Sequence, residues 1–166
     1  SEEGIKNLLK TIEILLELLK KKRRSKGALM QKLLTGKHRF KEFKSGEWEN
    51  VKLKTMVETF IVPMRDKPKV LTGPIPWCRI EDFDGKYLSK SKSNQGVSKE
   101  TVKQMNLKIY PIGTLLVSCS ANLGICAITS TELLTNQTFI GLVPNKDTSV
   151  NFLYYQMMFN APQLNK

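Results

Sequence analysis

The first 34 residues carry apolar side chains in alternating steps of three and four, a spacing typical of an amphipathic helix. The positions that form this apolar seam are Ile5, Leu8, Ile12, Leu15, Leu19, Leu29 and Leu33. Apolar residues at heptad positions a and d pack against another helix. We therefore expect one helix over residues 3–34 that pairs with a second helix, either from the same parent chain or from a second copy.

The end of this helix is predicted by the stretch "LMQKLLTGKHRF", residues 29–40. Gly36 is the expected stop, because glycine adopts the left-handed cap conformation without a steric penalty. The basic run "KKKRRSK" places Lys22 and Lys26 inside the seam. Two interpretations of that run stay open: a solvated helix face, or a face that lies along a phosphate backbone or an acidic partner.

The pattern changes after Gly36 and predicts a β-rich globule. In "GEWENVKLKTMVETF" an alternating segment at Trp48, Val51 and Leu53 precedes an expected short helix over 54–60. Four prolines in "VPMRDKPKVLTGPIPW", residues 62–77, predict a loop. Strands are expected at 75–80, 112–121, 124–130 and 136–145, a short helix at 97–105, and a helix in the last segment. The fold class is α+β, a long helix followed by a mixed globular domain.

The core of this globule is expected to include the most apolar strand candidates. Trp77, Leu116, Val117 and Phe139 are predicted to form one structural wall. Cys78, Cys119 and Cys126 all lie in apolar contexts, so we expect three small core residues and no disulfide framework.

The net charge of +12 changes the picture, because such an excess favours nucleic acid as a partner. Residues 1–44 carry 13 basic and 5 acidic side chains, and residues 86–108 carry six lysines against Glu100 alone. The second segment interleaves its lysines with serine, asparagine and glutamine, which contact phosphates and base edges. Together with the proline-rich loop it gives these candidate DNA-binding residues: Arg65, Lys67, Lys69, Lys86, Lys90, Lys92, Asn94, Gln95, Lys99, Lys103 and Gln104.

Signs of catalysis are weak. The sequence has no glycine-rich phosphate loop. A nucleophilic Cys119 would need the single histidine, His38, as its base. The acidic cluster Glu81, Asp82 and Asp84 could hold magnesium for a nuclease, although such clusters are more often solvated turns. No zinc site and no membrane span are expected, and the cytoplasm is the default location.

Five stretches together resemble the specificity subunits of type I restriction–modification systems. "KGALMQKLLTGKHRF" resembles the end of that family's spacer helix, and "GEWENVKL" supplies the tryptophan that follows it. "GPIPWCRIEDFDGKYL" and "PIGTLLVSCSANLGICAI" are similar to its Ile-Pro-Trp strand and Gly-x-hydrophobic strand. "LLTNQTFIGLVPN" is similar to its Thr-Asn-Gln strand, here Thr135, Asn136 and Gln137.

The resemblance implies a spacer helix over 1–36, a linker over 37–47 and a target recognition domain over 48–166. It implies a non-catalytic subunit that reads one half of a bipartite DNA target. The expected partners are double-stranded DNA, modification (methyltransferase) subunits, restriction subunits and a second spacer helix. S-adenosylmethionine, ATP and magnesium are expected on the partner subunits and not on this chain.

Three departures from the family pattern stand out. Leu53-Lys54 replaces the usual Leu-Gly, the chain has one helix and one recognition domain where two of each are usual, and it stops before the family's closing segment. These departures suggest a fragment of a longer or split subunit. The alternatives are a non-specific basic protein that dimerises through its helix and binds nucleic acid, and a metal-dependent nuclease.

Overall fold

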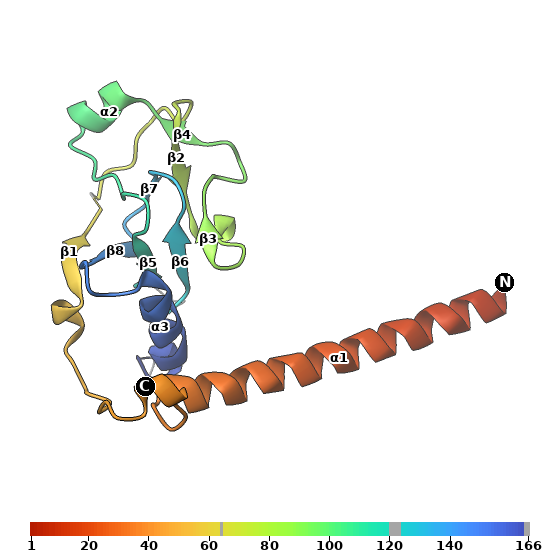
Figure 1. Ribbon diagram of the computed structural model, residues 1–166. Coiled ribbons are helices and arrows are strands. Elements are labelled where there is room, and N and C mark those ends of the chain that lie inside the picture. Colours follow the sequence, from red (N-terminus) through yellow and green to blue (C-terminus); the bar gives the residue numbers. More distant parts are fainter. Residues whose placement is uncertain (64, 120–123, 165–166) are drawn as a thin grey trace. The chain divides into compact units, whose positions relative to one another are not determined.

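The computed structural model describes residues 1–63, 65–119 and 124–164 and divides the chain into two units (Figure 1). The first unit is Ser1–Glu49 and the second is Asn50–Lys166. Each is described by itself.

The first unit is built on α1 (Glu2–Leu34), which confirms the predicted long helix. Ser1 caps its start by accepting a hydrogen bond from the Gly4 amide, at 3.4 Å. At the other end Gly36 has φ +70 and its amide donates to the Leu33 carbonyl. The predicted stop at Gly36 is therefore confirmed, with the left-handed conformation as its cause.

The segment after α1 folds back over the helix end. A 3-10 helix, η1, spans Lys41–Phe43. A Cβ atom on Gly36 would lie 2.8 Å from the Trp48 Cγ atom, so the indole of Trp48 occupies the space that any larger residue at 36 would need. Glycine at this position thus serves both the backbone turn and the packing of Trp48.

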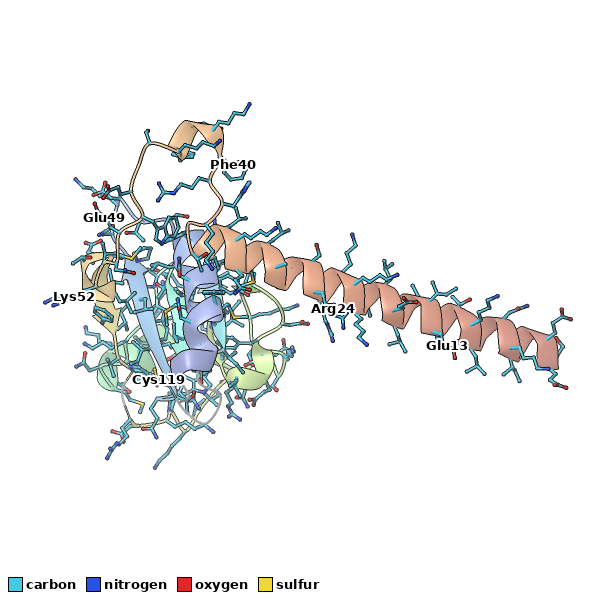
Figure 2. The ribbon with its side chains drawn as sticks, turned by 90° about the horizontal axis from the view of Figure 1, so that it is seen from below. Glu13, Arg24, Phe40, Glu49, Lys52 and Cys119 are labelled. Atoms are coloured by element: carbon cyan, nitrogen blue, oxygen red, sulfur yellow. The ribbon has the colours of Figure 1, made fainter. Side chains whose placement is uncertain are left out.

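No residue of α1 is buried, and its side chains project around the whole helix (Figure 2). The first five seam residues and Leu29 are each 44–61% exposed, and Leu33 is half-buried. Such a stripe is not stabilised by the helix itself, since a helix gains most of its stability by packing an apolar face. No described helix is long and apolar enough to cross a membrane.

The second unit contains two sheets. The larger has the order β1-β8-β5-β6-β3, in which all neighbours are antiparallel except β6 and β3. Its strands are β1 (Val57–Ile61), β3 (Tyr87–Leu88), β5 (Leu115–Ser118), β6 (Cys126–Thr129) and β8 (Phe139–Pro144).

The smaller sheet has the order β4-β2-β7, with β2 antiparallel to β4 and parallel to β7. Its strands are β2 (Ile75–Cys78), β4 (Gly96–Val97) and β7 (Leu134–Thr135). The helical elements are η2 (Leu53–Thr55), η3 (Ile80–Asp82), α2 (Lys99–Gln104) and α3 (Val150–Leu164). In Figure 1, β4 and α2 lie at one end of this domain and α3 lies towards the other.

Three apolar clusters hold the domain together. One face of the larger sheet packs against Leu153 and Tyr154 of α3. The opposite face buries Leu88, Tyr110 and Leu133. The third cluster joins the smaller sheet to the α2 region through residues such as Trp77. A strand forms within each of the expected ranges 75–80, 112–121, 124–130 and 136–145, and each strand is shorter than its range. The first ends at Cys78, and Ile80 begins η3. Positions 120–123 lie outside the described residues.

Two expectations about this core are wrong. Residues 57–61 form strand β1 and not a helix, because Val57–Ile61 pairs with β8, and β-branched and aromatic side chains suit a strand. The four residues predicted to share a wall are all buried, but Leu116 and Val117 face opposite sides of the larger sheet. Successive side chains of a strand alternate faces, so neighbours in sequence cannot share one wall.

A third expectation is wrong for one cysteine. Cys78 and Cys126 are buried, whereas Cys119 is exposed. Burial raises the pKa of both core thiols to about 12, so they stay protonated at neutral pH. All three cysteines are free thiols.

Candidate nucleic-acid interface

A buried carboxylate organises the loop between β3 and β4. Asp82, in η3, is only 6% exposed. Its two carboxylate oxygens accept hydrogen bonds from the Arg79 and Lys92 amides, each at 2.7 Å. Charge-assisted hydrogen bonds of this length are strong. Asp82 therefore ties the middle of the 89–95 loop, at Lys92, to η3 and the residue before it, Arg79.

The same loop is fastened at both of its ends. At the start, the Thr131 hydroxyl donates to the Ser89 carbonyl at 2.9 Å. At the finish, the Trp77 amide donates to the Gln95 carbonyl at 2.9 Å. Between them Asn94 adopts a left-handed φ of 52 and its amide donates to the Ser91 carbonyl. A loop held at three points presents its outward side chains in a defined geometry.

The exposed residues of this loop include most of the predicted contacts. Lys90, Lys92 and Asn94 are exposed and Gln95 is half-buried. The Lys92 ammonium donates to the Glu81 carbonyl at 2.8 Å, so its charge is held close to the loop. These residues form a compact polar surface of basic and amide groups.

Helix α2 follows this loop in the chain, directly after β4. Ser98 caps the helix by accepting a hydrogen bond from the Thr101 amide, and α2 lies within the range 97–105 where a short helix was expected. Lys99, Lys103 and Gln104 are exposed, while Val102 packs on the third apolar cluster. The pKa of Glu100 is lowered by a hydrogen bond to its backbone and by the Ser98 hydroxyl, so this acid stays ionised among the lysines.

The proline-rich segment joins the smaller sheet beside β4. The Gly96 amide donates to the Leu71 carbonyl at 3.1 Å, and the Gly73 amide donates to the Gly96 carbonyl at 2.9 Å. A Cβ atom on Gly96 would lie 2.1 Å from the Gly73 oxygen, so the two backbones approach too closely for a side chain. Arg65, Lys67 and Lys69 are exposed on this segment. Met64 lies outside the described residues.

Lys86 differs from the other candidates in its contacts with aromatic rings. Its ammonium lies 5.6, 5.5 and 4.6 Å from the ring centroids of Tyr87, Tyr154 and Tyr155, respectively. Such distances allow cation–π attraction. Lys86 thus lies against α3, and the remaining candidates lie on the 65–71, 89–95 and 99–104 segments. None of the DNA-contact assignments is tested by the structure, and each stays a prediction.

Sequence reasoning assigned Asp82 to a possible metal cluster and missed its positioning role. Both carboxylate oxygens already accept amide hydrogen bonds, and Glu81 is exposed and paired with Arg79 at 3.8 Å. Within the described residues no group of three His, Cys, Asp or Glu side chains could hold a metal ion. The signal that could have revealed the role is the spacing of Asp82 before a turn at Gly85, followed by a polar loop.

We expect Asp82→Ala to lower the free energy of unfolding by about 1–3 kcal/mol, since two amides lose a charged acceptor. Urea denaturation followed by circular dichroism measures this change. Asp84→Ala is the matched control, because Asp84 is an exposed carboxylate two residues away. Equal unfolding free energies for the two variants would contradict a positioning role for Asp82.

The fold and this surface together define a class of protein. Its members have a long helix with an exposed apolar seam, followed by an α+β domain that carries a basic, amide-bearing loop held by hydrogen bonds. A family model for the type I restriction modification DNA specificity domain matches residues 45–166. The chain belongs to this family, which confirms the resemblance seen in its sequence.

Relatives and solved structures agree with that membership. The chain is 30% identical over 112 residues to the type I restriction enzyme MjaIX specificity subunit of Methanocaldococcus jannaschii. This match covers 66% of the chain and 26% of the relative, so the chain spans about a quarter of the relative's length.

Two solved structures share the fold. The HsdS subunit from Thermoanaerobacter tengcongensis has a TM-score of 0.62 and 18% identity, over 98% of this chain and 40% of that one. A chain from work on complex assembly and conformational transition of the type I R-M system has a TM-score of 0.57 and 16% identity. That second match covers 96% of this chain and 42% of the other. The expected fold class, a long helix followed by an α+β domain, is confirmed.

Proposed function

We propose that this chain is a DNA-sequence specificity component of a type I restriction–modification enzyme and reads one half of a bipartite target. The observation that carries the proposal is the match of residues 45–166 to the DNA specificity domain. The held loop at 89–95 and the neighbouring α2 supply the reading surface. Their exposed amides contact base edges and their lysines contact phosphates.

The chain itself has no catalytic step in this proposal. Methylation, with S-adenosylmethionine, takes place on modification subunits, and cleavage, with ATP and magnesium, on restriction subunits. Two observations favour this division. Asp82 is used internally, and partial desolvation of the otherwise exposed Cys119 raises the pKa of its thiol, which disfavours a thiolate nucleophile. The complex acts in the cytoplasm, where its DNA substrate lies.

Helix α1 serves as a spacer that pairs with a second spacer helix, from the same parent chain or a second copy. The exposed seam supports this role, because an apolar stripe that faces water marks an interaction surface. Its length, 33 residues at about 1.5 Å each, sets a separation of about 50 Å. The modification subunits dock on the paired helices.

The test of the proposal is binding of the full chain to a panel of duplexes that differ in sequence at matched salt. A specificity subunit prefers one set of sequences. A non-specific basic binder would bind all of them with equal affinity. Cleavage of the duplexes by the chain with magnesium alone would favour the nuclease alternative.

Within the reading surface, we expect Gln104→Ala to relax preference at one target position by about 1–3 kcal/mol, the worth of a bidentate base contact. Lys99→Ala, five residues away, is the contrasting variant. It should weaken all duplexes alike and lower the salt slope by about one unit. Methylation by the reassembled complex reports the target choice, and an unchanged target after replacement of Asn94, Gln95 and Gln104 together would refute base reading by this segment.

A further inference from the structure

A basic cavity lies in the loop that follows α1. It is an open hollow with a volume of about 550 Å³, formed wholly within the first unit. Besides Gly36, its lining residues are Lys37, His38, Arg39, Phe40, Lys41 and Lys44. None of these residues belongs to the reading surface described above.

Local contacts give the cavity a fixed shape. The His38 amide donates to the Lys32 carbonyl at 3.0 Å, which ties the loop to the last turn of α1. The Arg39 guanidinium lies 5.8 Å from the centroid of the Trp48 ring and donates to the Phe43 carbonyl at 3.3 Å. Gly36 and Trp48 are in close contact, as described above. The loop is therefore braced at its start, middle and end.

The lining carries a high density of unpaired positive charge. The segment 36–44 contains Lys37, Arg39, Lys41 and Lys44 against one acid, Glu42, and two further acids, Glu47 and Glu49, follow it in the same unit. Among the residues that the structure describes, no ion pair joins any of these four cations to an acid. Four cations gathered around one hollow attract an anion with several charges, since their fields add.

We infer that this cavity binds the phosphate backbone of duplex DNA, apart from the bases of the target. Lysine and arginine are the side chains that contact phosphates, and arginine does so while stacked on an aromatic ring. The open shape suits a convex backbone better than an enclosed small ligand. The inference rests on the proposed function and adds to it a second, sequence-independent contact.

The test uses the full chain with the triple variant K37Q/K41Q/K44Q. If each lysine contacts one phosphate, the slope of log K against log salt falls by about 2.7 units. At 0.15 M salt the affinity for every duplex then falls by roughly 100-fold, with target preference unchanged. Fluorescence anisotropy titrations at several salt concentrations measure both quantities.

The matched control is K52Q/K54Q/K146Q, which removes the same charge from exposed lysines of the second unit. It should change the slope by much less. The single variants K37Q, K41Q and K44Q should each lower the slope by about 0.9 units and the affinity by about fivefold. They keep the test decisive if the triple variant folds poorly.

The outcomes separate three cases. If the unmutated chain binds no duplex, the proposed function fails. If it binds and the triple variant resembles the control, this inference alone is overturned. If the triple variant binds DNA normally but loses its modification subunits, the cavity holds an acidic protein surface and the inference is again overturned.

Discussion

Replacing Ile12 and Leu15 with alanine is expected to abolish association of α1 with its partner helix. Both residues lie at the centre of the exposed seam, 44% and 54% exposed in the isolated chain. A large-to-alanine change at a buried interface position costs about 2–5 kcal/mol, so two changes exceed what a helix pair can lose. Sedimentation of the purified chain, or co-purification with the rest of its parent subunit, measures the association.

Lys10→Ala with Glu13→Ala is the control for this experiment. Both residues are exposed on the same stretch of helix, and they occupy heptad positions outside the seam. The control leaves the net charge unchanged and should still associate. A monomeric unmutated chain at high concentration would rule out self-association and leave pairing within a longer parent chain.

Leu116→Asp is expected to unfold the second unit. Leu116 is fully buried in the centre of the larger sheet, where β5 lies between β8 and β6. The change removes an apolar contact with the cluster around Tyr110 and places an unpaired charge where water cannot reach it. An ordinary domain has a free energy of unfolding of only about 5–15 kcal/mol, so the loss of this contact together with a buried charge is expected to unfold it.

Ile112→Asp is the matched control for this variant, because Ile112 is 68% exposed in the turn that precedes β5. It should keep a cooperative thermal transition by circular dichroism. A normal melting transition for Leu116→Asp would contradict the assignment of β5 to the centre of the sheet.

The sequence predicted which residue types make up the candidate site, but it did not predict how these residues contact one another. Charge density and amide content marked residues 86–108 from the sequence alone. The packing of Lys86 against α3 was not visible there, because it depends on Tyr154 and Tyr155, almost 70 residues later in the chain. The role of Asp82 was hidden for a related reason. A carboxylate in a turn looks the same in sequence whether it faces water or two amides.

The sequence by itself determined the elements whose signals are local. Heptad spacing defined α1, the freedom of glycine to adopt positive φ defined its end at Gly36, and continuous apolar runs defined β5, β6 and β8. Tertiary structure alone decided the rest. Val57–Ile61 forms a strand because it pairs with the edge of β8. Leu116 and Val117 belong to different apolar clusters, because different parts of the chain cover the two faces of the larger sheet. Cys119 remained exposed despite its apolar neighbours. Pairing and coverage involve residues far apart in the chain, so no local pattern encodes them.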